Sequence, residues 1–143
     1  MTAQDATALE DHVDALAEGA PAHSAVWFEI PAADYERAIG FCEEVLKTKL
    51  ERFTENTPNP FAMFPTADGK GVSGHIYPGK PAIGGDGPTV HLTVPDTLEA
   101  TTARVKAAGG QVFPAVIEIP PGRFAYGVDT EGNSIGLFEV KGR

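Results

Sequence analysis

The apolar residues of segment 25–31 alternate with other side chains, and this period of two predicts a β-strand with one strongly apolar face. Trp27 and Glu29 lie on the opposite face of that strand. After Asp34, a residue type that commonly caps the start of a helix, apolar residues recur at helical spacing. Turns rich in Asn, Pro and Gly then separate three shorter strands, predicted over residues 49–54, 61–65 and 72–77.

The same order of elements recurs in the second half of the chain. The segment that starts at Phe28 matches the one that starts at Val90, and Asp96 and Glu99 have the spacing of a capping box at the start of a second helix. The repeat predicts a strand over 89–94, a helix that ends at the glycines 109 and 110, and strands over 111–117, 123–128 and 134–140. Two copies of one unit place equivalent residues around a pseudo-axis, so the space between them is the first candidate site.

We therefore expect one α+β domain over residues 24–140, preceded by an acidic N-terminal extension over residues 1–22. Module one covers residues 24–79, a Gly/Pro-rich linker covers 79–88, and module two covers 88–140. Each module has the order βαβββ. The extension has no counterpart in the repeat, and it is either a solvated segment or a helix that lies over a partner subunit.

Charge and composition exclude several classes of partner. The 143-residue chain has a net charge of −9, and residues 1–22 contain five acidic residues but no Lys or Arg. Nucleic acids are bound largely through basic residues that neutralise phosphates, so we do not expect a nucleic-acid partner. The apolar runs are too short to span a bilayer, and we expect no membrane association. Cys42 is the only cysteine, which excludes an internal disulfide and fits a cytoplasmic protein.

The order of elements, together with segments 27–41 and 129–137, resembles the vicinal oxygen chelate superfamily. This superfamily includes glyoxalase I, bleomycin-resistance proteins, fosfomycin-resistance enzymes and extradiol dioxygenases. The resemblance covers residues 24–140 and is greatest to small glyoxalase-like bacterial proteins. It implies two paired modules that form an open, barrel-like sheet around a cleft, with the helices outside, and it implies a homodimer.

In the members of the superfamily that use a metal, four inward side chains hold a divalent ion, one each from the first and last strand of each module. The resemblance places these positions at Trp27, Ser73, Thr89 and Gly136, none of which supplies an imidazole, a carboxylate or a thiolate. The match in the fourth strand is loose, so His75 is the alternative to Ser73 there. We therefore expect that the standard metal centre is absent and that the protein has no cofactor.

The next inward layer carries more reactive side chains. Residues two positions further along these strands share their face, and they are Glu29, His75, His91 and Phe138. Two imidazoles and a carboxylate would suit one divalent metal ion in a shifted site, provided that the strands bring them together. Glu29 and His91 are the candidate catalytic residues, because the repeat makes them equivalent across the pseudo-axis. The candidate ligand pocket consists of Trp27, Glu29, His75, His91, Tyr126 and Phe138.

Three classes of function follow from these residues. In the first, the protein binds a small molecule in the cleft between the modules without a metal ion, as bleomycin-resistance proteins do. In the second, it is a metal-dependent lyase, isomerase or dioxygenase in which Glu29 transfers a proton. In the third, side chains fill the cleft and the protein is an interaction module. The missing ligands at Trp27, Thr89 and Gly136 favour the first class and leave open whether the protein is an enzyme.

Overall fold

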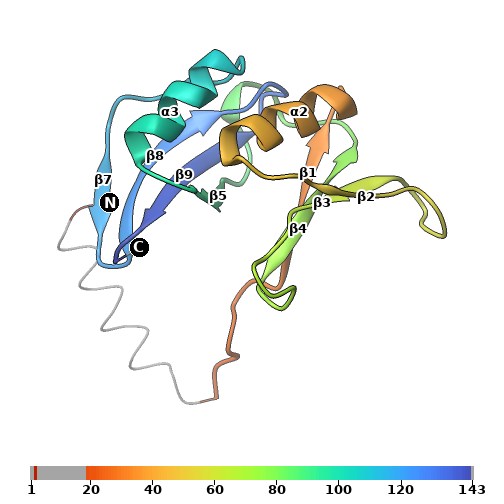
Figure 1. Cartoon of the computed structure of the whole chain (residues 1–143), viewed down its shortest axis with the longest axis horizontal. Helices are drawn as coiled ribbons and strands as arrows, with labels where there is room; N and C mark the ends of the chain where they lie inside the picture. The colour runs from red at the N-terminus through yellow and green to blue at the C-terminus, as the bar shows by residue number, and fades with distance from the viewer. Residues whose placement is uncertain (1, 3–18, 143) are drawn as a thin grey trace.

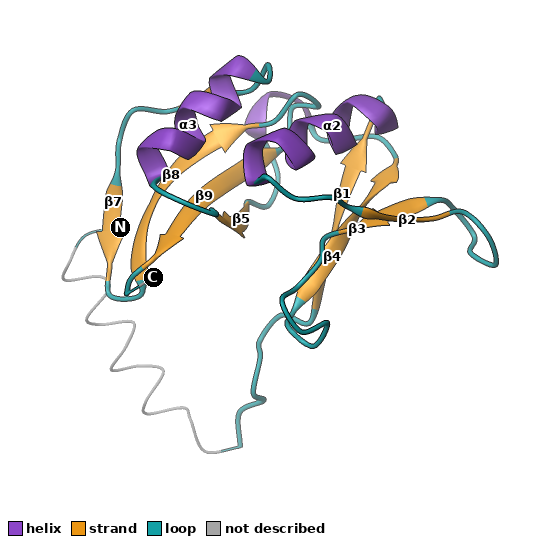
Figure 2. Ribbon diagram, in the orientation of Figure 1, coloured by secondary structure: helices purple, strands orange, loops and turns teal. Residues whose placement is uncertain are grey.

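The computed structural model describes residue 2 and residues 19–142. The predicted helical pattern within the N-terminal extension lies outside these residues. Two βαβββ modules follow each other along the chain, each with a helix on one side of a mixed sheet (Figures 1 and 2). The described chain has no helix that is long and apolar enough to cross a membrane.

Module one runs in the predicted order of one strand, one helix and three strands. Its elements are β1 (Trp27–Ala32), α2 (Tyr35–Leu46), β2 (Glu51–Phe53), β3 (Phe61–Met63) and β4 (Ser73–Pro78). The sheet has the order β1-β4-β3-β2, in which β1 and β4 are parallel and the other pairs are antiparallel. The register places Trp27 beside Ser73 and Glu29 beside His75.

Module two has the same plan with one additional short strand. The linker contains a 3-10 turn, and the elements that follow it are β5 (Val90–Thr93), α3 (Leu98–Ala107), β6 (Gln111–Val112), β7 (Ile117–Ile119), β8 (Gly122–Val128) and β9 (Ser134–Val140). The sheet has the order β5-β9-β8-β6, and β7 also pairs with β8. The prediction of one strand over 111–117 is therefore wrong. The N–H of Phe113 still donates to the carbonyl of Tyr126 in β8, but Pro114 has no N–H group to donate, and residues 114–116 leave the ladder.

The start of the second helix also differs from the prediction. Thr97, not Asp96, is the N-cap, and its side chain accepts a hydrogen bond from the backbone N–H of Ala100. Asp96 instead accepts hydrogen bonds from Thr101 and Arg104. The first helix begins as predicted, because Asp34 accepts a hydrogen bond from the backbone N–H of Arg37.

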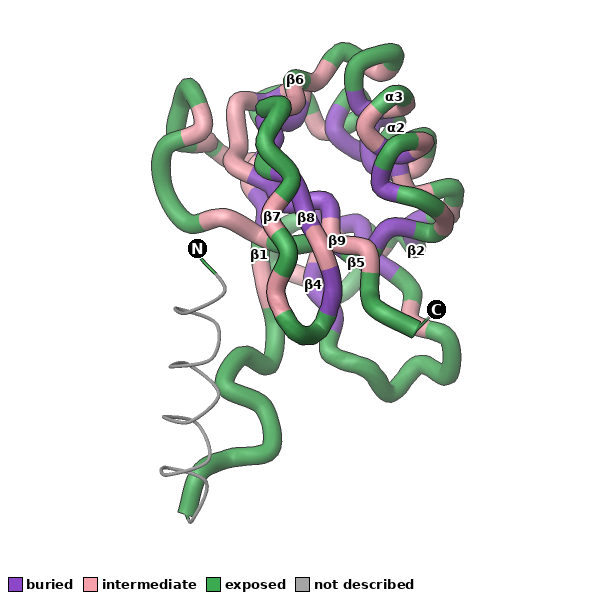
Figure 3. Tube along the Cα trace, turned by 90° about the vertical axis from the view of Figure 1, so that its left-hand side faces the viewer, coloured by how far each residue is buried: buried purple, intermediate pink, exposed green. Residues whose placement is uncertain are grey.

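The core lies between the helices and the faces of the sheets that they cover. Figure 3 shows the buried segments of the strands and helices gathered in this layer. Alternate residues of β1, such as Ile30 and Ala32, pack here against the apolar side of α2, which includes Ile39 and Val45. The residues of β1 that alternate with these, including Glu29, therefore lie on the open face of the sheet, away from the helix.

A buried carboxylate joins the two modules. Glu131, in the turn before β9, accepts hydrogen bonds from the backbone N–H of Asp34 and from the guanidinium of Arg37 in module one. Nearby, the side chain of Asn133 donates to the carbonyl of Pro31. Burial tends to raise the pKa of Glu131, but the hydrogen bonds from Arg37, Asp34 and Thr130 outweigh it and hold the pKa below the usual value. The charged form of Glu131 therefore fastens the modules together.

Candidate functional site

The open face of module one carries a chain of polar contacts centred on His75. The indole Nε1 of Trp27 donates a hydrogen bond of 2.8 Å to His75 Nδ1. On the other side of the ring, His75 Nε2 lies 3.2 Å from a carboxylate oxygen of Glu29. The three residues meet because β1 and β4 pair in parallel, with Glu29 directly opposite His75. The His75 side chain is only 14% exposed, whereas that of Glu29 is 64% exposed.

Aromatic rings surround this chain of contacts. The ring of Phe61 lies 4.7 Å from the His75 ring, and that of Tyr77 lies 5.9 Å from it in an edge-to-face arrangement. Phe53 stacks on Phe61 at 4.9 Å. A pocket of about 330 Å³ opens beside these rings, lined by Glu29, Thr57, Pro58, Asn59, Pro60, Phe61, His75 and Tyr77. Its wall thus combines one carboxylate, one imidazole and two aromatic rings with the loop between β2 and β3.

The open face of module two holds a second histidine among aromatic rings. The ring of His91 lies across Gly136, where an added Cβ would overlap it. Around this ring are Phe124 at 4.8 Å, Tyr126 at 5.7 Å and Phe138 at 6.1 Å between ring centroids. Because position 136 has no side chain, the imidazole can lie flat over β9 and reach the aromatic residues of β8.

The aromatic surroundings change the acidity of His91. Although the residue is more than a third exposed, its ring is partly removed from water, and this desolvation lowers the pKa of His91 below its usual value. The aromatic residues around it offer no carboxylate to stabilise the imidazolium. His91 therefore favours the neutral form at physiological pH.

A separate groove of about 320 Å³ runs between the modules. Module one contributes β1, the end of α2 and the turn that leads from β3 into β4. Module two contributes β5 and the residues after it. Phe28, Phe64 and His91 are among its walls. The predicted space between the modules is thus present, but Glu29 lines the other pocket, beside His75.

The six predicted pocket residues fall into two groups. Trp27, Glu29 and His75 lie together in module one, and His91, Tyr126 and Phe138 lie together in module two. Within the described residues, no three His, Cys, Asp or Glu side chains are placed to hold a metal ion. The shifted metal site formed by Glu29, His75 and His91 is therefore not assembled in this chain.

The four positions to which the resemblance assigns a metal do not fit one either. Trp27 Nε1 donates to His75, Ser73 Oγ donates to the carbonyl of Phe64, and Thr89 Oγ1 shares a hydrogen bond of 2.5 Å with Ser134 Oγ. Gly136 has no side chain. Hydroxyl, indole and glycine are poor ligands for a divalent ion, and here the hydroxyls are already bonded within the protein.

The strand register also corrects one equivalence between the modules. His91 pairs with Gly136 in module two, and Glu29 pairs with His75 in module one. The counterpart of Gly136 is therefore His75, the alternative position in the fourth strand, and not Ser73. Position 75 in module one thus carries an imidazole. The equivalent position 136 in module two is a glycine, over which the ring of His91 lies.

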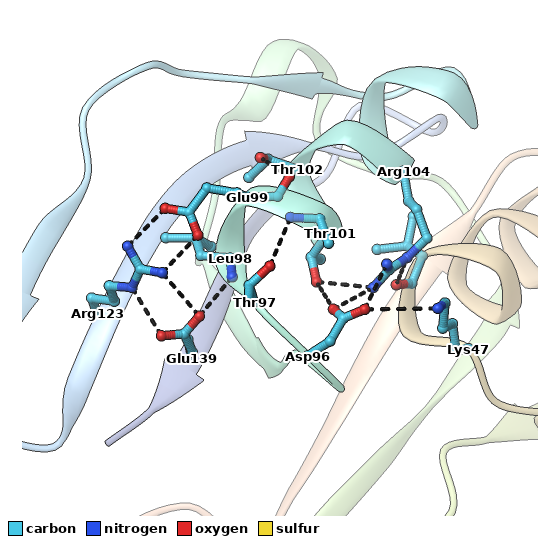
Figure 4. A network of polar contacts seen from close by, with 12 residues as sticks. Lys47, Asp96, Thr97, Leu98, Glu99, Thr101, Thr102, Arg104, Arg123 and Glu139 are labelled. Carbon is cyan, nitrogen blue, oxygen red and sulfur yellow. Dashed lines mark hydrogen bonds and ion pairs between the residues drawn. The ribbon is translucent and has the colours of Figure 1, made fainter. Parts of the chain in front are cut away.

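Arg123, in β8, is fully engaged within module two. Its guanidinium forms paired hydrogen bonds with Glu99 of α3 and with Glu139 of β9, and Glu139 also accepts the backbone N–H of Leu98 (Figure 4). Figure 4 also shows Asp96 between Arg104 of α3 and Lys47 at the end of α2, so that these two helices are joined. These arginines fasten α3 to its surroundings.

Sequence reasoning missed part of the wall around each histidine. Tyr77 was assigned only to a strand, and Phe124 was recognised only as part of the repeat. The signal that finds them is the register: Tyr77 is two residues after His75 on the same face, and Phe124 pairs with Phe138. Both assignments require the strand pairing, which the sequence pattern alone does not supply.

No protein-family model and no curated protein matches the sequence. Solved structures, however, match its fold. A glyoxalase/bleomycin resistance protein from Albidiferax ferrireducens has a TM-score of 0.58 at 20% identity, over 82% of this chain and 99% of its own. The fosfomycin resistance protein FosX from Listeria monocytogenes has a TM-score of 0.60 at 16% identity, over 83% of this chain and 91% of its own. A glyoxalase-related enzyme from Fulvimarina pelagi reaches 0.56 at 15% identity, over 82% and 88%.

The fold is therefore that of the vicinal oxygen chelate superfamily, as the sequence predicted. The two sheets, their helices and the duplicated βαβββ order agree with this assignment. At identities of this size the similarity establishes the fold alone, so any activity has to be argued from the chain's own residues.

Proposed function

We propose that this protein binds a small organic molecule with an aromatic or apolar part, and that it does so without a metal ion. The observation that carries the proposal is the chain of contacts from Trp27 through His75 to Glu29 at the wall of a pocket of about 330 Å³. Ligand pockets commonly have volumes of about 300 to 1,000 Å³ and combine apolar walls with a few fixed polar groups. Phe61 and Tyr77 supply such walls here, and Glu29 supplies an exposed polar group.

The binding role is favoured over a metal-dependent reaction by the chemistry of the donors. Trp27 donates to one nitrogen of His75, and Glu29 faces the other, so both nitrogens have partners within the protein. A metal ligand must offer a free lone pair, and His75 would have to give up the contact with Trp27 to do so. This arrangement supports a role of His75 in orienting Glu29 toward a ligand.

A homodimer is part of the proposal. The strands β1 and β5 are edge strands of their sheets, and unpaired edges are commonly covered by another element or chain. Side chains beside them are open to solvent, with Val26 75% and Trp27 43% exposed. Sedimentation at micromolar concentration is expected to show a dimer, and a protein that remains monomeric would contradict this part of the proposal.

The chain contains a built-in probe for the binding experiment, because Trp27 is its only tryptophan. We expect that a panel of small aromatic compounds includes ligands that change the Trp27 fluorescence and give a saturable heat in calorimetry. Treatment with a chelator should leave their affinity unchanged. Phe61→Ala should weaken binding about tenfold or more through loss of an aromatic wall, whereas Phe113→Ala, at an exposed aromatic residue outside this pocket, should not.

Two results would overturn the proposal. Stoichiometric iron, zinc, nickel or manganese in protein purified without chelator, with binding lost when that metal is removed, would favour the metal-dependent class. Absence of saturable binding across the whole panel, in a protein that remains folded, would favour the interaction module.

A further inference from the structure

The pocket beside Glu29 carries a negative charge that no nearby base neutralises. Glu29 is the one acidic residue of its lining, and none of the described lining residues is Lys or Arg. Arg52, on the neighbouring strand β2, lies opposite Ala62 in the strand register. Ala62 is fully buried on the helix side of the sheet, so the side chain of Arg52 is on that side too. Arg52 forms two hydrogen bonds there with Glu36 of α2. The pocket therefore keeps the charge of Glu29.

Hydrogen bonding also assigns the protonation state of His75. Because Trp27 Nε1 can only donate, His75 Nδ1 must accept and carries no proton. The single proton of the neutral ring then lies on Nε2, which faces a carboxylate oxygen of Glu29 at 3.2 Å. His75 thus contributes no positive charge in this arrangement, and its contact holds Glu29 at the wall of the pocket.

Aromatic faces add to the attraction for a cation. Tyr77, Phe61 and Phe53 follow one another across β4, β3 and β2 in register, on the same open face as Glu29. The electron-rich faces of such rings attract ammonium groups, and the effect grows where water is partly excluded. A carboxylate beside aromatic walls is a combination that favours an organic cation over an anion of the same size.

We infer that the ligand of this pocket is an organic cation, in which a protonated amine or a quaternary ammonium group is attached to an apolar body. Glu29 is the counter-ion, His75 and Trp27 position it, and Phe61 and Tyr77 enclose the apolar part. This inference rests on the proposed function and specifies the chemical class of the ligand.

Three compounds with one carbon skeleton test this inference: phenylpropylamine, phenylpropanol and phenylpropanoate, which are cationic, neutral and anionic at neutral pH. In calorimetry and in Trp27 fluorescence, the amine should bind about tenfold or more tightly than the alcohol, and the acid should bind most weakly. Added salt should weaken the binding of the amine and leave the binding of the alcohol nearly unchanged. Glu29→Gln should reduce the affinity for the amine to that for the alcohol.

The matched control is Glu44→Gln, which removes an exposed carboxylate from α2, on the other side of the sheet. It should leave all three affinities unchanged. Equal affinities for the three compounds, or an amine affinity that survives Glu29→Gln, would overturn the inference while leaving the proposed binding function in place. A protein that binds none of these compounds and no member of the wider aromatic panel would overturn both.

Discussion

At the scale of single residues, the most informative position is a glycine. Gly136 lets the ring of His91 lie across β9 on the open face of its sheet. Gly74 lets the ring of Phe28 lie across β4 on the face that the helix covers. An added methyl group would meet side-chain atoms alone at Gly136, but both the ring and the main-chain carbonyl of Phe28 at Gly74. A histidine side chain can turn away, whereas a paired strand cannot.

We therefore predict that Gly136→Ala lowers the free energy of unfolding by about 1 kcal/mol and that Gly74→Ala lowers it by about 3 kcal/mol. Urea denaturation measures both. In a His91→Ala background the penalty of Gly136→Ala should largely disappear, since the group that it displaces is gone. An undiminished penalty in that double variant would show that the ring is not what the methyl group displaces.

A second prediction concerns the acidity of His91. Its folded pKa is lowered by burial among aromatic rings, so protonation opposes folding. The stability associated with the neutral ring is present above its unfolded pKa of about 6.5 and declines as the pH falls through the folded value. Ring-proton NMR titration should give a pKa below that of free histidine. In Phe124→Ala, which admits water beside the ring, the pKa of His91 should rise toward that of free histidine. An unchanged pKa in this variant would contradict desolvation by the aromatic rings as the cause.

The partner of each site residue could be predicted only in part. Alternation placed Glu29 and Trp27 on one face of a strand, and repetition made His91 the equivalent of Glu29. Which residue lies next to Glu29 depends on the parallel pairing of β1 with β4, and those strands are separated by a helix and two other strands. A shift of two residues changes the neighbour without changing the face, and the sequence pattern is the same for both registers.

At the scale of elements, the start of α3 depends on a cation of the neighbouring sheet, Arg123 in β8. Arg123 bridges Glu99 of the helix and Glu139 of the sheet, and these contacts hold the pKa of both carboxylates below the usual value. Glu139 also accepts the backbone N–H of Leu98 in the first turn of α3. One arginine thus supports the start of the helix from two sides.

We predict that Arg123→Met destabilises the protein more than the removal of an exposed ion pair would, because it leaves Glu139, whose side chain is 25% exposed, without its cation. The control is Arg52→Met, which removes a similarly paired arginine at a more exposed site, with its side chain 45% exposed compared with 28% for Arg123. Its cost should stay within about 1 kcal/mol. Thermal denaturation of the two variants compares them, and equal losses would contradict the role assigned to Arg123.

Most elements followed from periodicity because their apolar residues face one core. The exceptions are local. The strand predicted over 111–117 is interrupted around Pro114, and the helix cap falls on Thr97 because Asp96 is held by Arg104. In the first case a missing N–H group decides between two patterns that the sequence makes equally acceptable, and in the second case an arginine further along the same helix decides.

At the scale of the whole molecule, a buried group of polar contacts around Glu131 is one of the links between the modules. Its side chain is fully buried, whereas that of its partner Arg37 is 52% exposed. Removal of the carboxylate leaves the backbone N–H of Asp34 without its acceptor. Because the pKa of Glu131 is lowered, this coupling is present above the unfolded pKa of about 4.3 and is lost as the pH falls through the folded value.

We predict that Glu131→Ala lowers the free energy of unfolding by about 3 kcal/mol and makes the two modules unfold separately. Trp27 fluorescence reports on module one alone, and far-ultraviolet circular dichroism reports on both modules. In the wild-type protein the two transitions should coincide, and in the variant they should not. Glu118→Ala, at an exposed carboxylate on β7, is the control and should leave the transitions coincident. Coincident transitions in Glu131→Ala would show that other contacts couple the modules.

The separation of the two histidines into different modules bears on how this chain can diverge. Where one ion is held by residues from both halves of a duplicated protein, a change in either half alters the shared centre, and the halves must evolve together. Here His75 has its partners within the first sheet, and His91 has its partners within the second. A substitution among the aromatic residues around one histidine therefore leaves the contacts of the other in place, so the two modules can vary independently.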